Sequence, residues 1–347
     1  MINLYGLELT KLEELMISYG QKRYRATQLF TWLYEKKARS FDEMSDVSKS
    51  FREVLNKDFC LELPKLYRRQ DSKDGTIKIL LELNDGSKVE TALMPYRYGN
   101  AICVSSQVGC NMACAFCASG LLKKKRNLEV SEIVGQVLVM NSILEEKNEK
   151  VTHIVVMGTG EPFDNYDNVL DFIRIMNHPK GMAIGARHIT VSTCGLIPGI
   201  MRYAHEGLQI NLAISLHAPN DEIRNKIMPI SKGYPLPKLM EAVKYYEKEA
   251  NRRVTFEYIM LKGVNDSLEC AKELVKLIKG TLAYVNLIPY NPVDENSFLR
   301  SDDKTVHAFF SYLLQHGVNT TIRKEFGNDI DAACGQLRAK DQHEKGN

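Results

Sequence analysis

The sequence predicts an α/β protein whose larger part is a parallel β-barrel, either full or partial. From residue 100 onward, apolar segments of strand length alternate with segments of helical periodicity, which is typical of βαβ units. Six or seven such units over about 240 residues suit a barrel. The expected strands are 102–104, 153–157, 189–192, 210–216, 254–260, 285–288 and 320–322, and the expected helices are 131–147, 166–177, 197–206, 236–250, 267–279 and 303–316.

The chain is expected to divide into a small amino-terminal domain, a hairpin, the barrel and a short tail. Residues 1–60 carry apolar side chains at helical spacing, so we expect a helical accessory domain. Its basic loops suit contact with nucleic acid, or the helices simply pack on the core. Residues 61–98 are expected to form a linker and a β-hairpin, and residues 99–340 the barrel. The polar residues 341–347 are expected to be disordered.

The hairpin is the clearest local prediction. Ile77, Ile79, Leu81 and Leu83 recur at every second position, and a turn at 84–87 leads to a second alternating stretch. Glu90 lies on that second strand, on the face opposite Val89. Alternation alone therefore predicts a surface carboxylate at Glu90, with a place in a cleft as the alternative.

Composition places the chain among ordinary soluble proteins. It has 347 residues, of which 44% are hydrophobic and 26% charged, and its formal net charge is +3. That charge is too small to imply nucleic acid by itself. No apolar run is long enough for a membrane span and no secretory leader is visible, so we expect a cytoplasmic protein without a membrane partner. One basic run, 123–126, follows a group of cysteines and is a candidate phosphate contact.

That group of cysteines is the strongest chemical signal. Cys110, Cys114 and Cys117 are spaced C-x3-C-x2-C, and Cys103 lies seven residues upstream. Thiols this dense in a chain without a secretory leader indicate metal binding more than disulfides. Two sites remain open. With Cys103 as fourth ligand the four thiolates suit a closed zinc site, whereas three thiolates on an iron–sulfur cubane leave one iron open for a small molecule.

Polar residues follow several of the predicted strands. They are found at 158–162, 192–195, 215–217 and Asn291, and the cysteines follow the first strand. Because carboxyl ends of parallel barrel strands meet at one rim, these residues are expected to lie together. The acid and bare backbone at 158–162 suit an amino group, such as that of S-adenosylmethionine (SAM). His217 alone is more often structural in such a position.

These motifs together resemble one enzyme family. The pattern Cys-x3-Cys-x-Phe-Cys at 110–117 resembles the radical SAM motif. The segments 103–110, 158–162, 215–220 and 329–337 resemble the RlmN/Cfr family of radical SAM RNA methyltransferases, and the resemblance extends nearly from end to end. It implies a partial (β/α)6-type radical SAM barrel with a small amino-terminal helical domain and a β-hairpin.

The resemblance also implies roles for individual residues. It makes Glu90 the proton acceptor, Cys334 the site of an S-methylcysteine intermediate, and Cys103 the thiol that forms a transient disulfide with Cys334. It implies a [4Fe–4S] cluster and two SAM molecules per turnover. The implied cluster ligands are Cys110, Cys114 and Cys117, and the implied SAM-binding residues are Gly160, Glu161, Ser192, Ser215, Leu216, His217 and Asn291.

The implied reaction is methylation of adenine C2 in 23S ribosomal RNA and, 3′ of the anticodon, in a subset of transfer RNAs. The implied partners are these RNAs and a reductase or flavodoxin-type electron donor, and the enzyme is expected to act as a monomer. Two alternatives remain at this point. One is a Cfr-type enzyme that methylates C8 of the ribosomal adenine, because it shares the cysteines. The other is a zinc-dependent RNA-binding module without catalysis.

Overall fold

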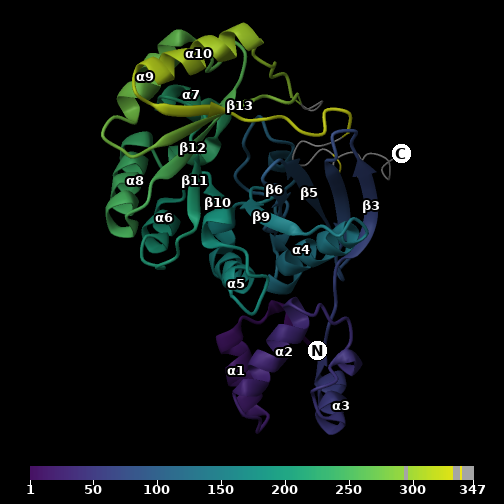
Figure 1. The fold of residues 1–347 in the computed structure, drawn as a ribbon. Coiled ribbons are helices and arrows are strands. Elements are labelled where there is room, and N and C mark those ends of the chain that lie inside the picture. The colour runs from purple at the N-terminus through teal and green to yellow at the C-terminus, as the bar shows by residue number, and fades with distance from the viewer. Residues whose placement is uncertain (293–295, 331–336, 338–347) are drawn as a thin grey trace.

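The central feature of the molecule is a curved ten-stranded sheet with helices on its outer face (Figure 1). The computed structural model describes residues 1–292, 296–330 and 337; Cys334 and the expected tail at 341–347 lie outside them. The strand order is β14-β13-β12-β11-β10-β9-β6-β5-β4-β3, so β14 and β3 are opposite edges. The sheet is curved but not closed by pairing between these edges, which confirms the partial barrel.

The larger part of the sheet, from β14 to β6, is parallel and built of βαβ units. Its strands and helices are β6 (Gly99–Cys103), α4 (Val130–Glu145), β9 (Val151–Val156), α5 (Tyr166–Asn177), β10 (Ile189–Thr193), α6 (Ile197–Tyr203), β11 (Asn211–Ser215), α7 (Asp221–Ile227), α8 (Leu236–Ala250), β12 (Val254–Met260), α9 (Leu268–Leu277), β13 (Tyr284–Pro289), α10 (Asp303–Gln315) and β14 (Asn319–Ile322). Three predicted elements, β12, α5 and α8, match residue for residue. In the described chain no helix is long and apolar enough to span a membrane.

The other side of the sheet is antiparallel. It consists of β3 (Lys65–Asp71), β4 (Ile77–Glu82) and β5 (Lys88–Tyr96), which pair in succession. β5 then pairs with β6, with Ala92 opposite Cys103. The predicted hairpin is therefore continuous with the barrel sheet. It places its residues beside the strand that leads into the cysteine loop.

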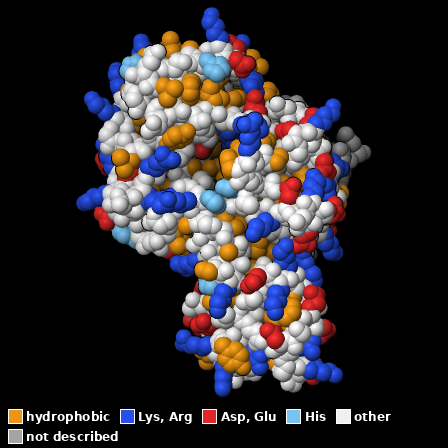
Figure 2. All heavy atoms as spheres, in the orientation of Figure 1, with side chains coloured by type: hydrophobic (Ala, Val, Ile, Leu, Met, Phe, Trp, Pro, Cys, Tyr) orange, Lys and Arg blue, Asp and Glu red, His pale blue; other side chains and the backbone are white. Residues whose placement is uncertain are grey.

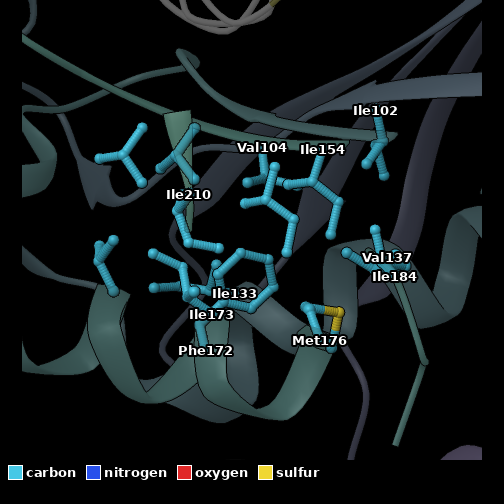
Figure 3. Packing of buried hydrophobic residues seen from close by; sticks show 14 of the residues in the cluster. Ile102, Val104, Ile133, Val137, Ile154, Phe172, Ile173, Met176, Ile184 and Ile210 are labelled. Atoms are coloured by element: carbon cyan, nitrogen blue, oxygen red, sulfur yellow. The ribbon is translucent and has the colours of Figure 1, made fainter. Parts of the chain in front are cut away.

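The main core lies between the sheet and the helices outside it. Figure 3 shows Ile102 and Val104 facing side chains of α4 and α5, among them Phe172 and Met176. Ile102, Val104 and Phe172 are fully buried. Since alternate strand residues face opposite sides of a sheet, the residues between these apolar ones face the concave interior. Cys103 is one of them.

The amino-terminal helices form a smaller body below the barrel (Figure 1). It contains α1 (Leu9–Ser18), α2 (Tyr24–Tyr34) and α3 (Lys49–Asp58), and it begins and ends with the parallel pair β1 (Ile2–Asn3) and β2 (Phe59–Cys60). The Phe30 ring packs edge-on against His178 at 5.1 Å, and Lys11 forms an ion pair with Asp171 of α5. These contacts attach the helices to the outside of the barrel.

The segment after β14 crosses to the antiparallel side of the sheet. The Gly327 amide donates to Asp74 Oδ2 at 2.9 Å, and Asp329 accepts from the Lys73 amide at 3.2 Å and from the Ser72 hydroxyl. Ser72 to Asp74 belong to the turn between β3 and β4. The segment therefore links the two edges of the open sheet through side-chain contacts rather than strand pairing.

Candidate active site

The concave side of the sheet encloses a cavity of about 360 Å³, within the usual range for small-molecule sites. Figure 2 shows this hollow with lysine and arginine side chains around it. Its lining contains most of the predicted site residues: Glu90, Cys103, Cys110, Cys114, Cys117, Gly160, Glu161, Ser192, Ser215, His217 and Asn291. Leu216 is fully buried and does not line the cavity, and Cys334 lies outside the described residues. Residues from many strands thus meet, as expected for a barrel.

The three closely spaced cysteines sit on one anchored loop. The Cys110 amide donates to Leu122 O at 2.8 Å, and the Ala115 amide donates to Ile227 O at 2.9 Å. Burial raises the pKa of Cys110 to about 11 and also raises the pKa of Cys114. Thiols with such pKa values stay protonated at neutral pH unless a cation binds the sulfur. In the described part of the chain, no three metal-binding side chains meet closely enough to hold a single ion.

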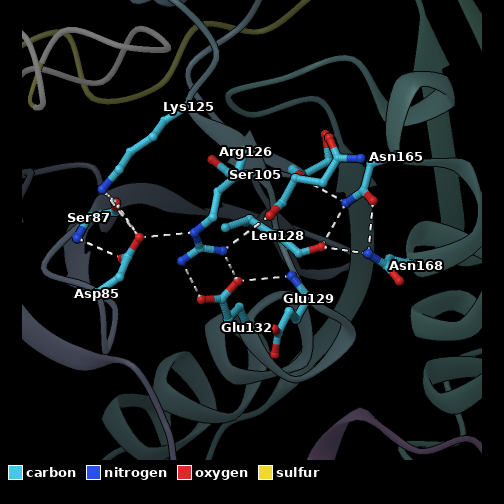
Figure 4. Close-up of polar contacts among 12 residues, drawn as sticks. Asp85, Ser87, Ser105, Lys125, Arg126, Leu128, Glu129, Glu132, Asn165 and Asn168 are labelled. Carbon is cyan, nitrogen blue, oxygen red and sulfur yellow. Dashed lines mark hydrogen bonds and ion pairs between the residues drawn. The ribbon is translucent and has the colours of Figure 1, made fainter.

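The basic residues after this loop are part of its anchorage. Arg126 binds Glu132 through two nitrogens at 2.7 Å and Asp85 at 3.0 Å (Figure 4). Lys125 lies 2.8 Å from the Ser87 hydroxyl, and Lys124 forms an ion pair of 2.7 Å with Asp164. Three of the four cations in the run 123–126 are therefore already engaged within the protein. These contacts tie the cysteine loop to the hairpin, to α4 and to Asp164. The phosphate contact expected at this run stays a prediction.

Gly160 and Glu161 form a second part of the lining. Gly160 has a φ of 113°, and a Cβ there would lie 2.6 Å from Gln107 Cβ, so the backbone is bare where it faces the cavity. The two oxygens of Glu161 accept from the amides of Phe163 at 3.0 Å and Cys194 at 2.7 Å. Burial nevertheless raises the pKa of Glu161. A carboxylate offers about four acceptor positions, so this one retains capacity for a cationic amino group.

Ser192, Ser215 and His217 line the same rim on neighbouring strands. The two serine hydroxyls are 3.5 Å apart. His217 Nδ1 accepts from the Ile259 amide at 3.1 Å, which leaves the proton of the neutral ring on Nε2. Burial, with Arg224 nearby, lowers the pKa of His217 to about 3. The ring packs edge-on against Phe116 at 4.9 Å, so this histidine both supports the cysteine loop and faces the cavity.

Glu90 does not lie on the surface. Its side chain is 4% exposed and pairs with Lys78, 2% exposed, at 2.8 Å. The polar face of the hairpin points into the barrel because the apolar face, with Ile77 and Ile79, belongs to the main core. The prediction that Glu90 is a surface carboxylate is therefore wrong, and the alternative, a place in a cleft, is what the structure shows. Glu90 is two residues from Ala92 on β5, and Ala92 pairs with Cys103.

Several lining residues escaped the sequence analysis. Lys78 is one, and Glu257 with Arg323 are others. Burial raises the pKa of Glu257 while Arg323 acts to lower it, and Asn286 donates to its Oε2 at 2.8 Å. A signal did exist for Glu257, because it is the single charged residue in the otherwise apolar run 254–260. A charge in a fully buried strand indicates a partner or a cavity.

Comparison with known proteins agrees with this site. The model of the radical SAM superfamily matches residues 104–278, which contain the cysteine loop, and the model of the ribosomal RNA large subunit methyltransferase N-terminal domain matches residues 2–61. A probable dual-specificity RNA methyltransferase RlmN of Spiroplasma citri is 56% identical over 342 residues, covering 99% of each chain. The chain belongs to the RlmN family of radical SAM RNA methyltransferases.

Other RlmN-family relatives agree over the full length. The probable dual-specificity RNA methyltransferase RlmN of Geobacillus kaustophilus is 54% identical, covering 99% of this chain and 94% of its own. The crystal structure of a radical SAM methyltransferase from Sphaerobacter thermophilus superposes with a TM-score of 0.92 at 43% identity, covering 97% of this chain and 99% of that chain. The zinc-module alternative is set aside by these matches, because the matched family is enzymatic.

Membership of the radical SAM family implies a [4Fe–4S] cluster and SAM. The residues of the cavity fit both. Three cysteine thiols lie on one loop at the cavity wall, and the backbone at Gly160, the Glu161 carboxylate and the serine hydroxyls lie along the same rim. Thiolates are the ligands that iron–sulfur clusters use, and carboxylate, hydroxyl and bare backbone groups are suited to the amino acid and ribose parts of SAM.

Proposed function

We propose that this chain methylates C2 of adenine in RNA through a methylated cysteine. The substrates are one adenine at the peptidyl transferase centre of 23S ribosomal RNA and the adenine 3′ of the anticodon in a subset of transfer RNAs. The observation that carries the proposal is the position of Glu90 and Cys103 on adjacent strands of one cavity, which the cysteine loop also lines. A carboxylate and a thiol beside the cluster loop are what this reaction requires in addition to a radical source.

The cofactors bring the methyl group and the radical chemistry. Adenine C2 is an sp2 carbon between two nitrogens and is not a nucleophile, so the ordinary transfer of a methyl cation does not reach it. Bound at Cys110, Cys114 and Cys117, a [4Fe–4S] cluster with SAM supplies a methyl group and, upon reduction, a 5′-deoxyadenosyl radical. We assign SAM binding to Gly160, Glu161, Ser192, Ser215, His217 and Asn291. Leu216 does not line the cavity; its N–H donates to Glu257 O and its carbonyl accepts from Arg224 Nε, so its proposed role is to hold Ser215 and His217 at the rim.

Glu90 is the proposed proton acceptor. Once C2 has gained a carbon substituent, its hydrogen must leave as a proton, and a general base must lie within reach. The buried carboxylate faces the cavity, and Lys78 compensates its charge at 2.8 Å. This pair therefore supports Glu90 in the role of base.

Cys103 and Cys334 are the proposed thiols of the shuttle. Cys334 carries the carbon that becomes bonded to C2. The Cys103 thiolate then attacks the Cys334 sulfur, so that the S–S bond forms as the sulfur–carbon bond breaks, and the released carbon takes up a proton to become the methyl group. Returning the disulfide to two thiols takes two electrons and two protons from a thiol reductant, and a reductase or flavodoxin-type donor supplies the single electron for the radical step. Cys334 lies outside the described residues. The chain just before it is anchored through Asp329 to the turn that precedes Thr76, a residue of the cavity wall.

The test is a single anaerobic turnover with methyl-labelled SAM, followed by mass spectrometry of the digested RNA and of tryptic peptides. We expect label on the peptide containing Cys334 and then in 2-methyladenosine. Appearance of 8-methyladenosine without 2-methyladenosine would assign the Cfr-type reaction instead. A Cys334→Ala variant that still methylated RNA would remove the cysteine shuttle.

A further inference from the structure

A series of five aromatic rings runs outward from the cavity wall. Phe326, which lines the cavity, packs edge-on against Tyr96 with ring centroids 4.6 Å apart. Tyr96 stacks on Tyr98 at 4.8 Å, Tyr98 packs edge-on against His153 at 5.0 Å, and His153 stacks on His188 at 4.2 Å. We call these five residues the aromatic strip. None of them belongs to the site described above except Phe326.

The aromatic strip lies at the end of the barrel opposite the cysteine loop. Tyr98 precedes β6, His153 is near the start of β9, and His188 comes just before β10. The cysteine loop instead follows β6. Because strand residues alternate between faces, His153 shares the cavity face of β9 with Val155 and Met157. The strip therefore follows the inner wall of the barrel from its amino-terminal end toward Cys103.

The local backbone holds the strip in place. Gly99, next to Tyr98, has a φ of 141°, and a Cβ there would lie 2.2 Å from Thr152 Oγ1. That hydroxyl contacts both Asn100 O at 3.2 Å and His153 Nδ1 at 2.8 Å. The turn after Tyr96 is thus pressed against β9, which fixes Tyr98 and His153 relative to each other. Rings that are pre-positioned lose little entropy when a ligand stacks on them.

The outer rings are open to solvent and lie among cations. Tyr98 is 66% exposed and His188 is also exposed. Arg97 and Arg187 adjoin them in sequence and are exposed, and among the described residues neither side chain has an ion-pair partner. At the inner end, Lys324 lies 4.6 Å from the Phe326 ring centroid. Exposed rings together with unpaired cations are the arrangement that binds single-stranded nucleic acid, in which bases stack and phosphates pair.

We propose that the aromatic strip is the platform on which unpaired nucleotides beside the target adenine stack, so that the target base enters the barrel from the end opposite the cysteine loop. The inference rests on the proposed RNA substrate and adds the path by which it reaches the cavity. A base that must be reached inside a protein cavity has to leave its stack. Stacking of its neighbours on Tyr98 and His188 offsets part of that cost.

The experiment compares two double variants. Tyr98→Ala/His188→Ala removes the exposed rings of the strip. Tyr312→Ala/His316→Ala removes a matched tyrosine–histidine stack, with centroids 4.0 Å apart, at the carboxyl end of α10 and outside the strip. Affinity for an anticodon stem-loop with an unpaired adenine is measured by fluorescence anisotropy at fixed salt. SAM cleavage with dithionite in the absence of RNA reports whether the cofactor site is intact.

We expect the strip variant to bind the stem-loop on the order of 10- to 100-fold more weakly, with SAM cleavage retained. The α10 variant is expected to bind like the unmodified protein, and Tyr98→Phe to retain affinity because it retains the ring. The single Tyr98→Ala variant repeats the test if the double variant unfolds. Equal affinity in the strip variant and the unmodified protein overturns the proposal.

Two further outcomes are separable. If the strip variant binds RNA normally and turns over with dithionite, but fails with a flavodoxin system, the strip docks the electron donor and the RNA platform is wrong. If the unmodified protein binds the stem-loop through the strip but forms no 2-methyladenosine, the proposed C2 reaction fails while the platform stands.

Discussion

The two ends of the barrel use their positive charges differently. At the end with the cysteine loop, Lys124 and Arg126 are held by carboxylates of the same chain. At the other end, Arg97 and Arg187 are exposed, and the described residues provide them with no ion-pair partner. Closeness to the cysteine loop is thus a poor guide to which cations are left available to a ligand. Accounting for each cation's partner separates those that stabilise the fold from those available to a ligand.

The largest effect is expected at the cysteine loop. A Cys114→Ala variant should show no measurable methylation and should lose its iron, because on the proposed assignment the cluster loses one of its three protein ligands. Iron analysis and anaerobic turnover measure both. Cys270→Ala is the control, since Cys270 is a buried residue of α9 away from the cavity, and it should retain iron and activity. Retained iron and activity in the Cys114 variant would contradict the ligand assignment.

The second-largest effect is expected at the buried ion pair between Lys78 and Glu90 in the cavity wall. Lys78→Met should destabilise the protein by about 3–5 kcal/mol and abolish most turnover, because it leaves the buried Glu90 carboxylate without its partner. Denaturant unfolding measures the stability. The double variant Lys78→Met/Glu90→Gln removes both charges and should recover much of the stability, but not the activity. Recovery of activity in the double variant would exclude Glu90 as the base.

His217 predicts a dependence of stability on pH. Its folded pKa of about 3 lies below the ordinary value near 6.5, so below pH 6.5 the unfolded chain takes up a proton that the folded chain does not. The contribution of His217 to the free energy of unfolding is therefore fully present above pH 6.5 and is lost as the pH falls toward 3. Between pH 7 and pH 5 the loss is about 2 kcal/mol.

A His217→Asn variant tests this dependence. Asparagine tolerates the positive φ of 56° at this position and can still accept from the Ile259 amide. Unfolding curves at both pH values should show the variant losing about 2 kcal/mol less than the unmodified protein. Equal losses in the two proteins would mean that His217 is not kept neutral by burial.

The smallest effects are expected for single arginine substitutions, which compare a cation at one end of the barrel with a cation at the other. Arg126→Gln should lower stability by about 1 kcal/mol and leave RNA affinity unchanged, because its partners Glu132 and Asp85 are internal. Arg187→Gln should do the reverse, with unchanged stability and severalfold weaker RNA binding at low salt. Thermal unfolding and anisotropy measure the two quantities. The distinction between the two ends fails if Arg126→Gln weakens RNA binding more than Arg187→Gln.

The parallel part of the fold could be predicted from sequence because its strands are buried on both faces. Runs such as Val254–Met260 are apolar except for Thr255 and Glu257, and amphipathic helices such as Leu236–Ala250 separate them. β3 escaped prediction because it is an edge strand, Lys65–Asp71, with four charged residues and no apolar alternation. Helix α7, Asp221–Ile227, escaped because only Ile223 and Ile227 in it are apolar, which is too few for a periodic signal.

The parts of the site that are contiguous in sequence were easier to predict than the parts that only the fold brings together. The cysteine loop is one short segment, so its chemistry was visible. Glu90 was misplaced because alternation shows which residues share a face but not which face is inside, and here the polar face of the hairpin lines the barrel. Lys78 was missed for the same reason. The aromatic strip joins residues from 96 to 326, and only the folded sheet brings them together.

The pairing of β1 with β2 has a consequence for how this protein evolves. Because these strands lie side by side in parallel, the chain enters and leaves the helical segment at 4–58 at one place. A segment whose two ends adjoin can lengthen, shorten or be exchanged without pulling the remaining structure apart. The helical segment at 4–58 can therefore change during evolution, while the sheet that positions the thiols and the buried carboxylate keeps its register.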